Sequence, residues 1–271
     1  MTGHVFTIAG GKGGVGKTTT AVNVGVALQE AGHDVAVVDA DLGMANLAAM
    51  LDVEYDHSLH EVLAEDATVS DTLTGAPGDI TVVPGEQSLE AFADADPAKL
   101  NKVIRTLINA YDAVLIDTGA GLSHEATVPL GLADSVVLVT TPDSVAIGDA
   151  NKTADLAARV DGKVIGSILT RATGPEDIKA VAAEIQHDML AVIPDDPEAT
   201  TREPHVINAP DSPAAAAYRR LAASLKRVLL GEPVETIAPE DTDWFPADEA
   251  NEDTDNETDN DSGGVFGLFN R

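Results

Sequence analysis

The sequence predicts an α/β protein with a single doubly wound, mostly parallel sheet, followed by a disordered acidic C-terminal tail. Three observations support this fold class. Apolar runs alternate with segments of helical spacing along residues 1–231, the connections between them are short, and the composition changes sharply after Gly231. A chain of 271 residues is long enough for one large domain of this kind.

The expected strands are short apolar runs bounded by polar or turn-forming residues, and they read as buried strands. They cover residues 4–9, 34–38, 80–83, 113–117, 135–141, 163–169 and 190–193. The expected helices carry apolar residues at helical spacing, with Gly32 as a stop signal after the first and Pro97 in the first turn of the third. They cover residues 18–31, 58–63, 97–110, 144–160 and 212–230.

Residues 11–18, GKGGVGKT, match the phosphate-loop pattern G-x-x-x-x-G-K-[ST] at every fixed position. The motif stands between an expected strand and an expected helix, which is the context that it requires. Its glycines allow the backbone to turn tightly and approach an anion, and the helix N-terminus offers partial positive charge. We expect Lys17 to reach the β- and γ-phosphates of a triphosphate and the Thr18 hydroxyl to ligate Mg²⁺.

A second lysine, Lys12, lies inside this loop. The segment K-G-G-V-G-K-T-T resembles the deviant phosphate loop of the MinD/ParA family of ATPases. In that family this lysine crosses a dimer interface and touches the nucleotide of the partner subunit. The resemblance implies a homodimer that forms on ATP binding and encloses two ATP molecules with Mg²⁺. The alternative is that Lys12 only adds local positive charge to the anion site.

Two aspartates follow the expected strand 34–38. Carboxylates at this edge of a parallel strand lie where α/β sheets bind ligands. The segment D-A-D-L-G-M-A-N-L from Asp39 resembles switch I of MinD-like ATPases. The resemblance implies that Asp41 orients the attacking water and that Asp39 lies near the Mg²⁺ shell, with a capping or turn aspartate as the alternative for Asp39.

The apolar run 113–116 ends in Asp117, which is the Walker B pattern of a carboxylate that steadies Mg²⁺. The continuation D-T-G-A-G resembles switch II of the same family, closest to its MinD and FlhG-like (flagellar-number regulator) branches. The small residues would let the loop close on the γ-phosphate and open after hydrolysis. The implied catalytic residues are Lys12, Lys17 and Asp41, and the implied metal-site residues are Thr18, Asp39 and Asp117.

Base recognition departs from the family pattern. The family often places Asn at the end of the sixth strand to read adenine, whereas this chain has Thr170-Arg171. Pro194-Asp195-Asp196 resembles the family's second base-lining loop. The implied nucleotide contacts are Gly11, Lys12, Gly13, Gly14, Val15, Gly16, Lys17, Thr18, Thr19, Asp117, Gly119, Pro194 and Asp195.

The charge balance is strongly acidic. Sixteen Lys and Arg face 46 Asp and Glu, a formal net charge of −30, and residues 1–231 alone hold 33 acidic and 15 basic residues. Salt screens such self-repulsion, so we expect a protein from a salt-rich cytoplasm, a halophile.

The same charge balance argues against broad DNA binding. The last helix offers one basic cluster for it, at Arg219, Arg220, Lys226 and Arg227. The absence of cysteine argues against the iron–sulfur members of the superfamily.

The tail is expected to divide into an acidic disordered linker, 232–261, and a short apolar tip, 262–271. Trp244 and Phe245 are expected to form a separate contact point on this linker. The tip is interpreted as a protein-docking peptide, a weak membrane anchor or an inert end. No apolar run reaches the ~18 residues of a membrane-spanning helix, so a soluble protein is expected. His57 and His60 are expected on a solvated helix face rather than at a metal.

These features lead to one functional hypothesis and two alternatives. The resemblance implies a slow, Mg²⁺-dependent ATPase that dimerises on ATP and positions cellular machinery, a division site, a motility structure or a polar array, by cycling on and off a membrane or partner. A soluble FlhG-like regulator of motility assembly and a ParA-like DNA-partitioning ATPase are the alternatives. A cytoplasmic location is expected, with peripheral attachment at the membrane or a cell pole as a further possibility.

Overall fold

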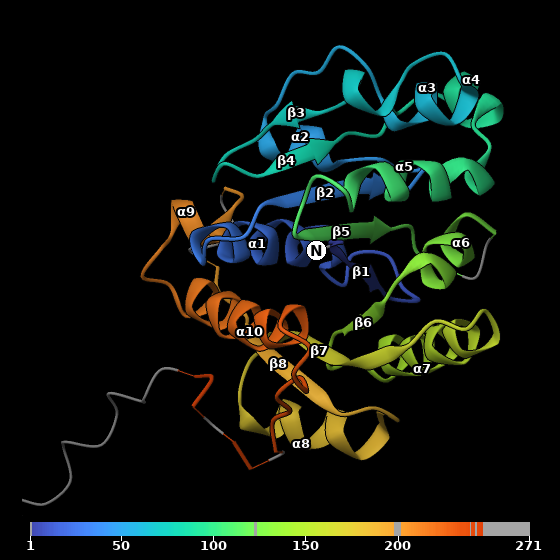
Figure 1. The fold of residues 1–271 in the computed structure, drawn as a ribbon. Helices are drawn as coiled ribbons and strands as arrows, with labels where there is room; N and C mark the ends of the chain where they lie inside the picture. Colours follow the sequence, from blue (N-terminus) through green and yellow to red (C-terminus); the bar gives the residue numbers. More distant parts are fainter. Residues whose placement is uncertain (1, 122–123, 198–201, 239, 242, 246–271) are drawn as a thin grey trace, which may run out of the picture.

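A computed structural model describes residues 2–121, 124–197, 202–238, 240–241 and 243–245 (Figure 1). Eight strands form one sheet in the order β3-β4-β2-β5-β1-β6-β7-β8. Every neighbouring pair is parallel except β3 with β4. The predicted α/β class with a mostly parallel sheet is therefore confirmed.

The strands are β1 (His4–Ala9), β2 (Val35–Ala40), β3 (Thr74–Gly75), β4 (Thr81–Val83), β5 (Ala113–Thr118), β6 (Ser135–Thr140), β7 (Val164–Ala172) and β8 (Met189–Pro194). The α-helices are α1 (Lys17–Glu30), α2 (Leu47–Leu51), α3 (Leu59–Ala64), α4 (Leu89–Asp94), α5 (Leu100–Leu107), α6 (His124–Leu132), α7 (Ser144–Arg159), α8 (Pro175–Glu184), α9 (His205–Asn208) and α10 (Pro213–Leu229).

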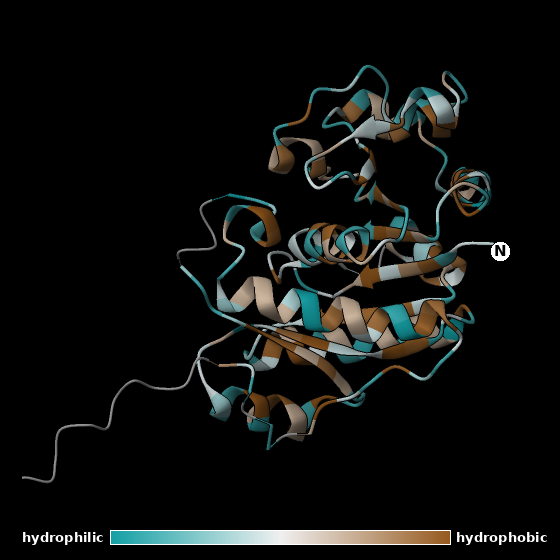
Figure 2. Ribbon diagram, turned by 60° about the vertical axis from the view of Figure 1, so that its left-hand side comes forward, coloured by the Kyte–Doolittle hydropathy of each residue, from teal (hydrophilic) through white to brown (hydrophobic). Residues whose placement is uncertain are grey.

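Helices cover both faces of the sheet, which is why its central strands are apolar throughout. Successive side chains of a strand point to opposite faces. In β2, Val35 and Val37 join the core under α1 and α10, whereas Ala36 and Val38 join the core under α3 and α5. Figure 1 shows α1 and α10 on one side of the sheet and α5, α6 and α7 on the other. In Figure 2 hydrophobic residues run along the strands, and the helices are striped.

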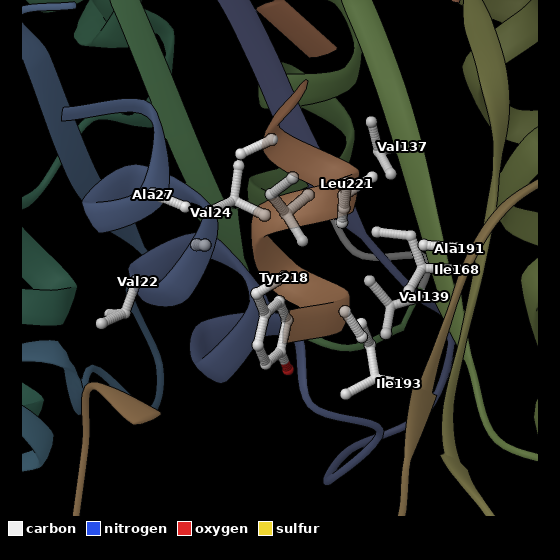
Figure 3. Packing of buried hydrophobic residues seen from close by; sticks show 14 of the residues in the cluster. Val22, Val24, Ala27, Val137, Val139, Ile168, Ala191, Ile193, Tyr218 and Leu221 are labelled. Atoms are coloured by element: carbon white, nitrogen blue, oxygen red, sulfur yellow. The ribbon is translucent and has the colours of Figure 1, made fainter. Parts of the chain in front are cut away.

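The long helices α1 and α10 pack against each other as well as against the sheet. Figure 3 shows Tyr218 and Leu221 of α10 between Val24 of α1 and strand residues such as Ile168 and Ile193. Tyr218 is 2% exposed, and the other four side chains belong to the same buried cluster. This packing fixes α1, and with it the loop that precedes α1.

Two groups of elements differ from the prediction. The expected helix 97–110 begins as a 3₁₀ turn, Pro97–Lys99, which Asp96 caps, and continues directly as the shorter α5. The strand β3 and the helices α2, α4, α6, α8 and α9 were not predicted. Strand β3 has two residues, too few to show an alternating pattern.

The predicted boundary at Gly231 is too early, because the chain continues to pack on the domain as far as Phe245. The Ile237 N–H donates to the Met189 carbonyl at 2.8 Å, and Trp244 is 8% exposed within the main core. The Arg220 guanidinium lies 5.3 Å from the centre of the Trp244 ring. Trp244 is therefore a core residue rather than a separate contact point. Its burial was not predicted because the segment is strongly acidic and contains few apolar residues.

The remaining tail predictions concern residues 246–271, including the apolar tip, and lie outside the described residues. Within the part of the chain that the structure describes, no helix combines the length and the apolar character needed to cross a membrane.

Candidate functional site

The phosphate loop connects β1, near the middle of the sheet, to α1. In the neighbouring strands β2 and β5, Asp39 is paired in register with Asp117, so the two carboxylates end their strands side by side. A cavity of about 840 Å³ opens at this edge. Its lining includes the loop, the segment 40–44 and Gly119, which brings the phosphate loop and both predicted switch segments to one place.

The loop backbone needs its glycines. Gly14 and Gly16 have φ angles of 75° and 93°, in the left-handed region that side chains disfavour. A Cβ on Gly11 would lie 2.5 Å from the Asp149 carbonyl oxygen. No side chain of the described residues caps α1, and its first turn contains no acidic residue. The N-terminal N–H groups of α1 are therefore available to an anion.

Lys17 is buried in this cavity, with 8% of its surface exposed. Burial lowers the pKa of its ammonium group, and the carboxylates of Asp117 and Asp41 oppose that shift. Its Nζ lies 3.4 Å from the carbonyl oxygen of Lys12. No ion pair with a described carboxylate engages this Nζ, so a phosphate in the loop would give it a direct anionic partner.

Asp117 is the least satisfied polar group of the site. It is 1% exposed, and neither carboxylate oxygen has a hydrogen-bond partner among the described residues. Burial, with repulsion from Asp39, raises the pKa of Asp117 to about 8; Lys17 and the Thr18 hydroxyl, which is near without meeting hydrogen-bond geometry, favour its charged form. A buried carboxylate without a partner beside the loop threonine fits Mg²⁺, which prefers oxygen ligands.

Asp39 is also buried, but both of its carboxylate oxygens accept hydrogen bonds from backbone N–H groups. Its Oδ2 accepts from the N–H groups of Asn46 and Leu47, both at 2.9 Å, and its Oδ1 accepts from the N–H of Asp41 at 3.3 Å. Burial raises the pKa of Asp39 to about 6 against the effect of these bonds. The arrangement favours the capping alternative, since Asp39 ties switch I to β2 and to the start of α2; its place near a Mg²⁺ shell stays a prediction.

Asp41 lies where switch I meets switch II. Its Oδ1 accepts from the Met44 N–H at 3.1 Å, and a Cβ on Gly119 would lie 3.0 Å from the same oxygen. Asp41 also faces the cavity and is close enough to Lys17 to influence its pKa. Its role in orienting a water molecule toward a bound phosphate stays a prediction.

Lys12 forms an ion pair with Asp143, at 2.9 Å, in the turn between β6 and α7. Both side chains are almost half exposed, at 43% and 45%. The Thr141 hydroxyl and Lys12 hold the pKa of Asp143 at about 2. Because an exposed pair contributes little stability, Lys12 can leave it for a stronger anionic partner at small cost.

A smaller cavity of about 190 Å³ adjoins the loop at Gly16 and Thr19. Its lining contains the predicted base-site residues Pro194 and Asp195, together with Thr170. The Thr170 hydroxyl lies 2.7 Å from the Val15 carbonyl oxygen, so its one proton is directed to the backbone.

Sequence reasoning assigned no role to three further residues around these two cavities. Arg171, with a left-handed φ of 54°, lines both. Glu203 and His205 line the smaller one; Glu203 accepts from Asn23 of α1 at 2.7 Å and pairs with His205 at 3.2 Å. The contact between Asn23 and Glu203 joins positions 180 apart in the chain, and no local pattern signals it.

The fold and the site together define a P-loop nucleotide-binding protein: a parallel sheet, a phosphate loop after a central strand and an unpartnered aspartate on the adjacent strand. The family model described as the CobQ/CobB/MinD/ParA nucleotide binding domain matches residues 6–204. The chain belongs to this family.

Individual relatives agree with this membership. An uncharacterised ATP-binding protein of Methanocaldococcus jannaschii is 36% identical over 226 residues, covering 80% of this chain and 86% of that protein. The septum site-determining protein MinD of Bacillus subtilis is 30% identical over 255 residues, covering 86% and 91%. The structure of the septum site-determining protein MinD complexed with Mg-ADP from Pyrococcus horikoshii matches with a TM-score of 0.78 at 35% identity, covering 83% of this chain and 96% of that one.

Proposed function

We propose that the protein is a Mg²⁺-dependent ATPase that dimerises on ATP and positions cellular machinery by cycling on and off a membrane surface or a protein partner. One observation carries this proposal. Lys17, Asp41 and the unpartnered Asp117 converge on the edge of the sheet where the phosphate loop begins α1. The relative complexed with Mg-ADP supports the same class of ligand for this site.

The residues divide the work of phosphoryl transfer to water, which depends on positioning and charge neutralisation. The loop N–H groups and Lys17 hold the phosphates. Thr18 and Asp117 hold Mg²⁺, which supplies charge neutralisation when bound. Asp41 orients the attacking water, and separation of Asp41 from Gly119 accompanies opening of the switches after hydrolysis.

The rim of the large cavity supports the homodimer. Met44, Leu89 and Phe92 lie at this rim and are 75%, 89% and 36% exposed. Apolar side chains gathered at one edge mark an interaction surface. A second copy placed on this rim would cover them, and the resemblance to the MinD/ParA family implies that its Lys12 then reaches the nucleotide of the first copy.

The basic cluster on α10 gives little support to DNA partitioning. Arg219 pairs with Glu30, and Arg227 with Glu232 and Glu235. Lys226 donates to the carbonyl of Ala31, and Arg220 covers Trp244.

A soluble regulator of motility assembly keeps support from the D-T-G-A-G match in switch II. The acidic surface supports a salt-rich cytoplasm, and the tip 262–271 is proposed as the membrane or partner contact.

The test combines phosphate release in vitro with localisation of a fluorescent fusion, for the wild type, Lys17→Ala and Asp41→Ala. We expect slow hydrolysis and polar or moving patches for the wild type, diffuse protein for Lys17→Ala and fixed patches for Asp41→Ala. Deletion of 262–271 should keep hydrolysis and abolish the patches. If the wild type hydrolyses ATP but all three proteins give uniform fluorescence, the positioning role is contradicted, and a soluble regulator becomes the better interpretation.

A further inference from the structure

His60 occupies an unexpected place. The prediction of a solvated face is wrong for this residue, which is 1% exposed. Its Nδ1 accepts the Glu86 N–H at 3.0 Å, so Nδ1 carries no proton. Its Nε2 lies 2.9 Å from the Leu42 carbonyl oxygen, an acceptor, so Nε2 carries the proton and donates. The two backbone partners therefore determine the tautomer.

These partners belong to two segments that border the large cavity. Leu42 directly follows Asp41 in switch I, and Glu86 lies in the connection between β4 and α4. A second bond runs beside the first, from Gln87 Nε2 to the Ala45 carbonyl at 2.5 Å. Two side-chain bridges thus fasten switch I, from Leu42 to Ala45, to the connection 84–88.

The same connection leads to the rim of the cavity. Ser88 caps α4 by accepting the Ala91 N–H at 3.2 Å. Helix α4 carries Leu89 and Phe92, which belong to the exposed apolar rim. A partner that contacts α4 at this rim could therefore influence the position of Asp41 through the connection 84–88 and its hydrogen bonds to switch I.

We propose that His60 is a positioning residue: by donating to the Leu42 carbonyl it sets the position of Asp41 for hydrolysis and couples switch I to α4. This inference rests on the proposed ATPase function and adds a residue that lies outside the nucleotide cavity. It differs from a filling role in the core, because it assigns the effect on hydrolysis to one hydrogen bond, the Nε2 donation to Leu42, while the Nδ1 bond to Glu86 supplies only the link toward α4.

Two substitutions separate these bonds. The amide of His60→Gln extends to the Nε2 position and keeps the donation to Leu42, whereas the amide oxygen of His60→Asn replaces only Nδ1 and keeps the Glu86 contact. We expect kcat for ATP to fall roughly 10- to 100-fold in the Asn variant, because Asp41 loses its support, and to stay near wild type in the Gln variant. The affinity for a non-hydrolysable ATP analogue should stay within about twofold in both. His57→Asn is the matched control, since His57 is 44% exposed and pairs only with Glu61 among the described residues.

Equal kcat values for folded Gln and Asn variants would overturn the proposal, as would a loss of analogue affinity that accounts for the loss of rate. If neither variant folds, long-range ¹H–¹⁵N NMR of the wild-type chain decides. We expect an Nε2–H tautomer for His60, with resonances that shift on adding Mg²⁺ and the ATP analogue and not on adding Mg²⁺ and ADP; a different tautomer, or no selective shift, contradicts it. A wild type that binds the analogue without hydrolysing ATP would instead contradict the proposed function.

Discussion

Strands β2 and β5 each carry an aspartate near their C-terminal ends, and the two carboxylates differ in their hydrogen bonds. Asp39 and Asp117 are neighbours in register, and both are buried with raised pKa values. Three backbone N–H groups occupy the oxygens of Asp39, while those of Asp117 have no partner among the described residues. Since a buried carboxylate is costly without partners, the first carboxylate stabilises the protein's own backbone, and the second is the one that we propose as a metal ligand.

The largest expected effect comes from Asp117→Asn. The amide cannot provide the charge that Mg²⁺ requires, so ATP hydrolysis should fall roughly 100-fold, equivalent to about 2.7 kcal/mol of lost transition-state stabilisation. The free protein should become more stable at pH 8, because an uncompensated buried charge is removed. Phosphate release and urea unfolding measure the two effects. A variant that hydrolyses ATP at the wild-type rate would show that Asp117 holds no metal.

Asp39→Ala should act in the opposite direction on stability. The substitution leaves the N–H groups of Asn46 and Leu47 without their acceptor, which costs about 1–3 kcal/mol for each group that stays buried. Urea unfolding of the nucleotide-free protein measures this loss. If Asp39→Ala is as stable as the wild type and Asp117→Ala is not, the roles of the two carboxylates are exchanged.

The pH dependence of stability gives the most specific effect. The pKa of Asp117 rises on folding from 3.8 to about 8, so between these values the native state holds a proton that the unfolded state has released. The free energy of unfolding therefore falls as pH rises through this window. For Asp39 the corresponding window ends near pH 6. We expect the difference between Asp117→Asn and the wild type to grow between pH 6 and 8; a constant difference would contradict the assignment.

The sequence allowed the sheet, the phosphate loop and the positions of Asp39, Asp41 and Asp117 to be predicted, because strand patterns and loop chemistry are local. A parallel sheet then brings the strand ends together without further information. This explains why the edge of the sheet at which these residues gather could be predicted, while their roles toward a nucleotide stay predictions.

Contacts between distant segments were not predictable in this way. The burial of His60 depends on switch I and on the connection after β4, and that of Trp244 depends on Arg220 and the core beside β8. Both residues stand in acidic, polar segments whose average composition indicates exposure. Whether Asp39 binds its own backbone or a metal also depended on the path of the chain after the strand.

The central claim, that ATP controls association of two copies, is tested most directly by light scattering of Asp41→Ala, which should bind ATP without consuming it. With Mg²⁺ and ATP we expect twice the chain mass of 27.9 kDa, and with Mg²⁺ and ADP the mass of a single chain. Adding Lys12→Ala to the same variant should prevent the dimer. A single-chain mass with ATP bound, or a dimer that ignores the nucleotide, would contradict the account.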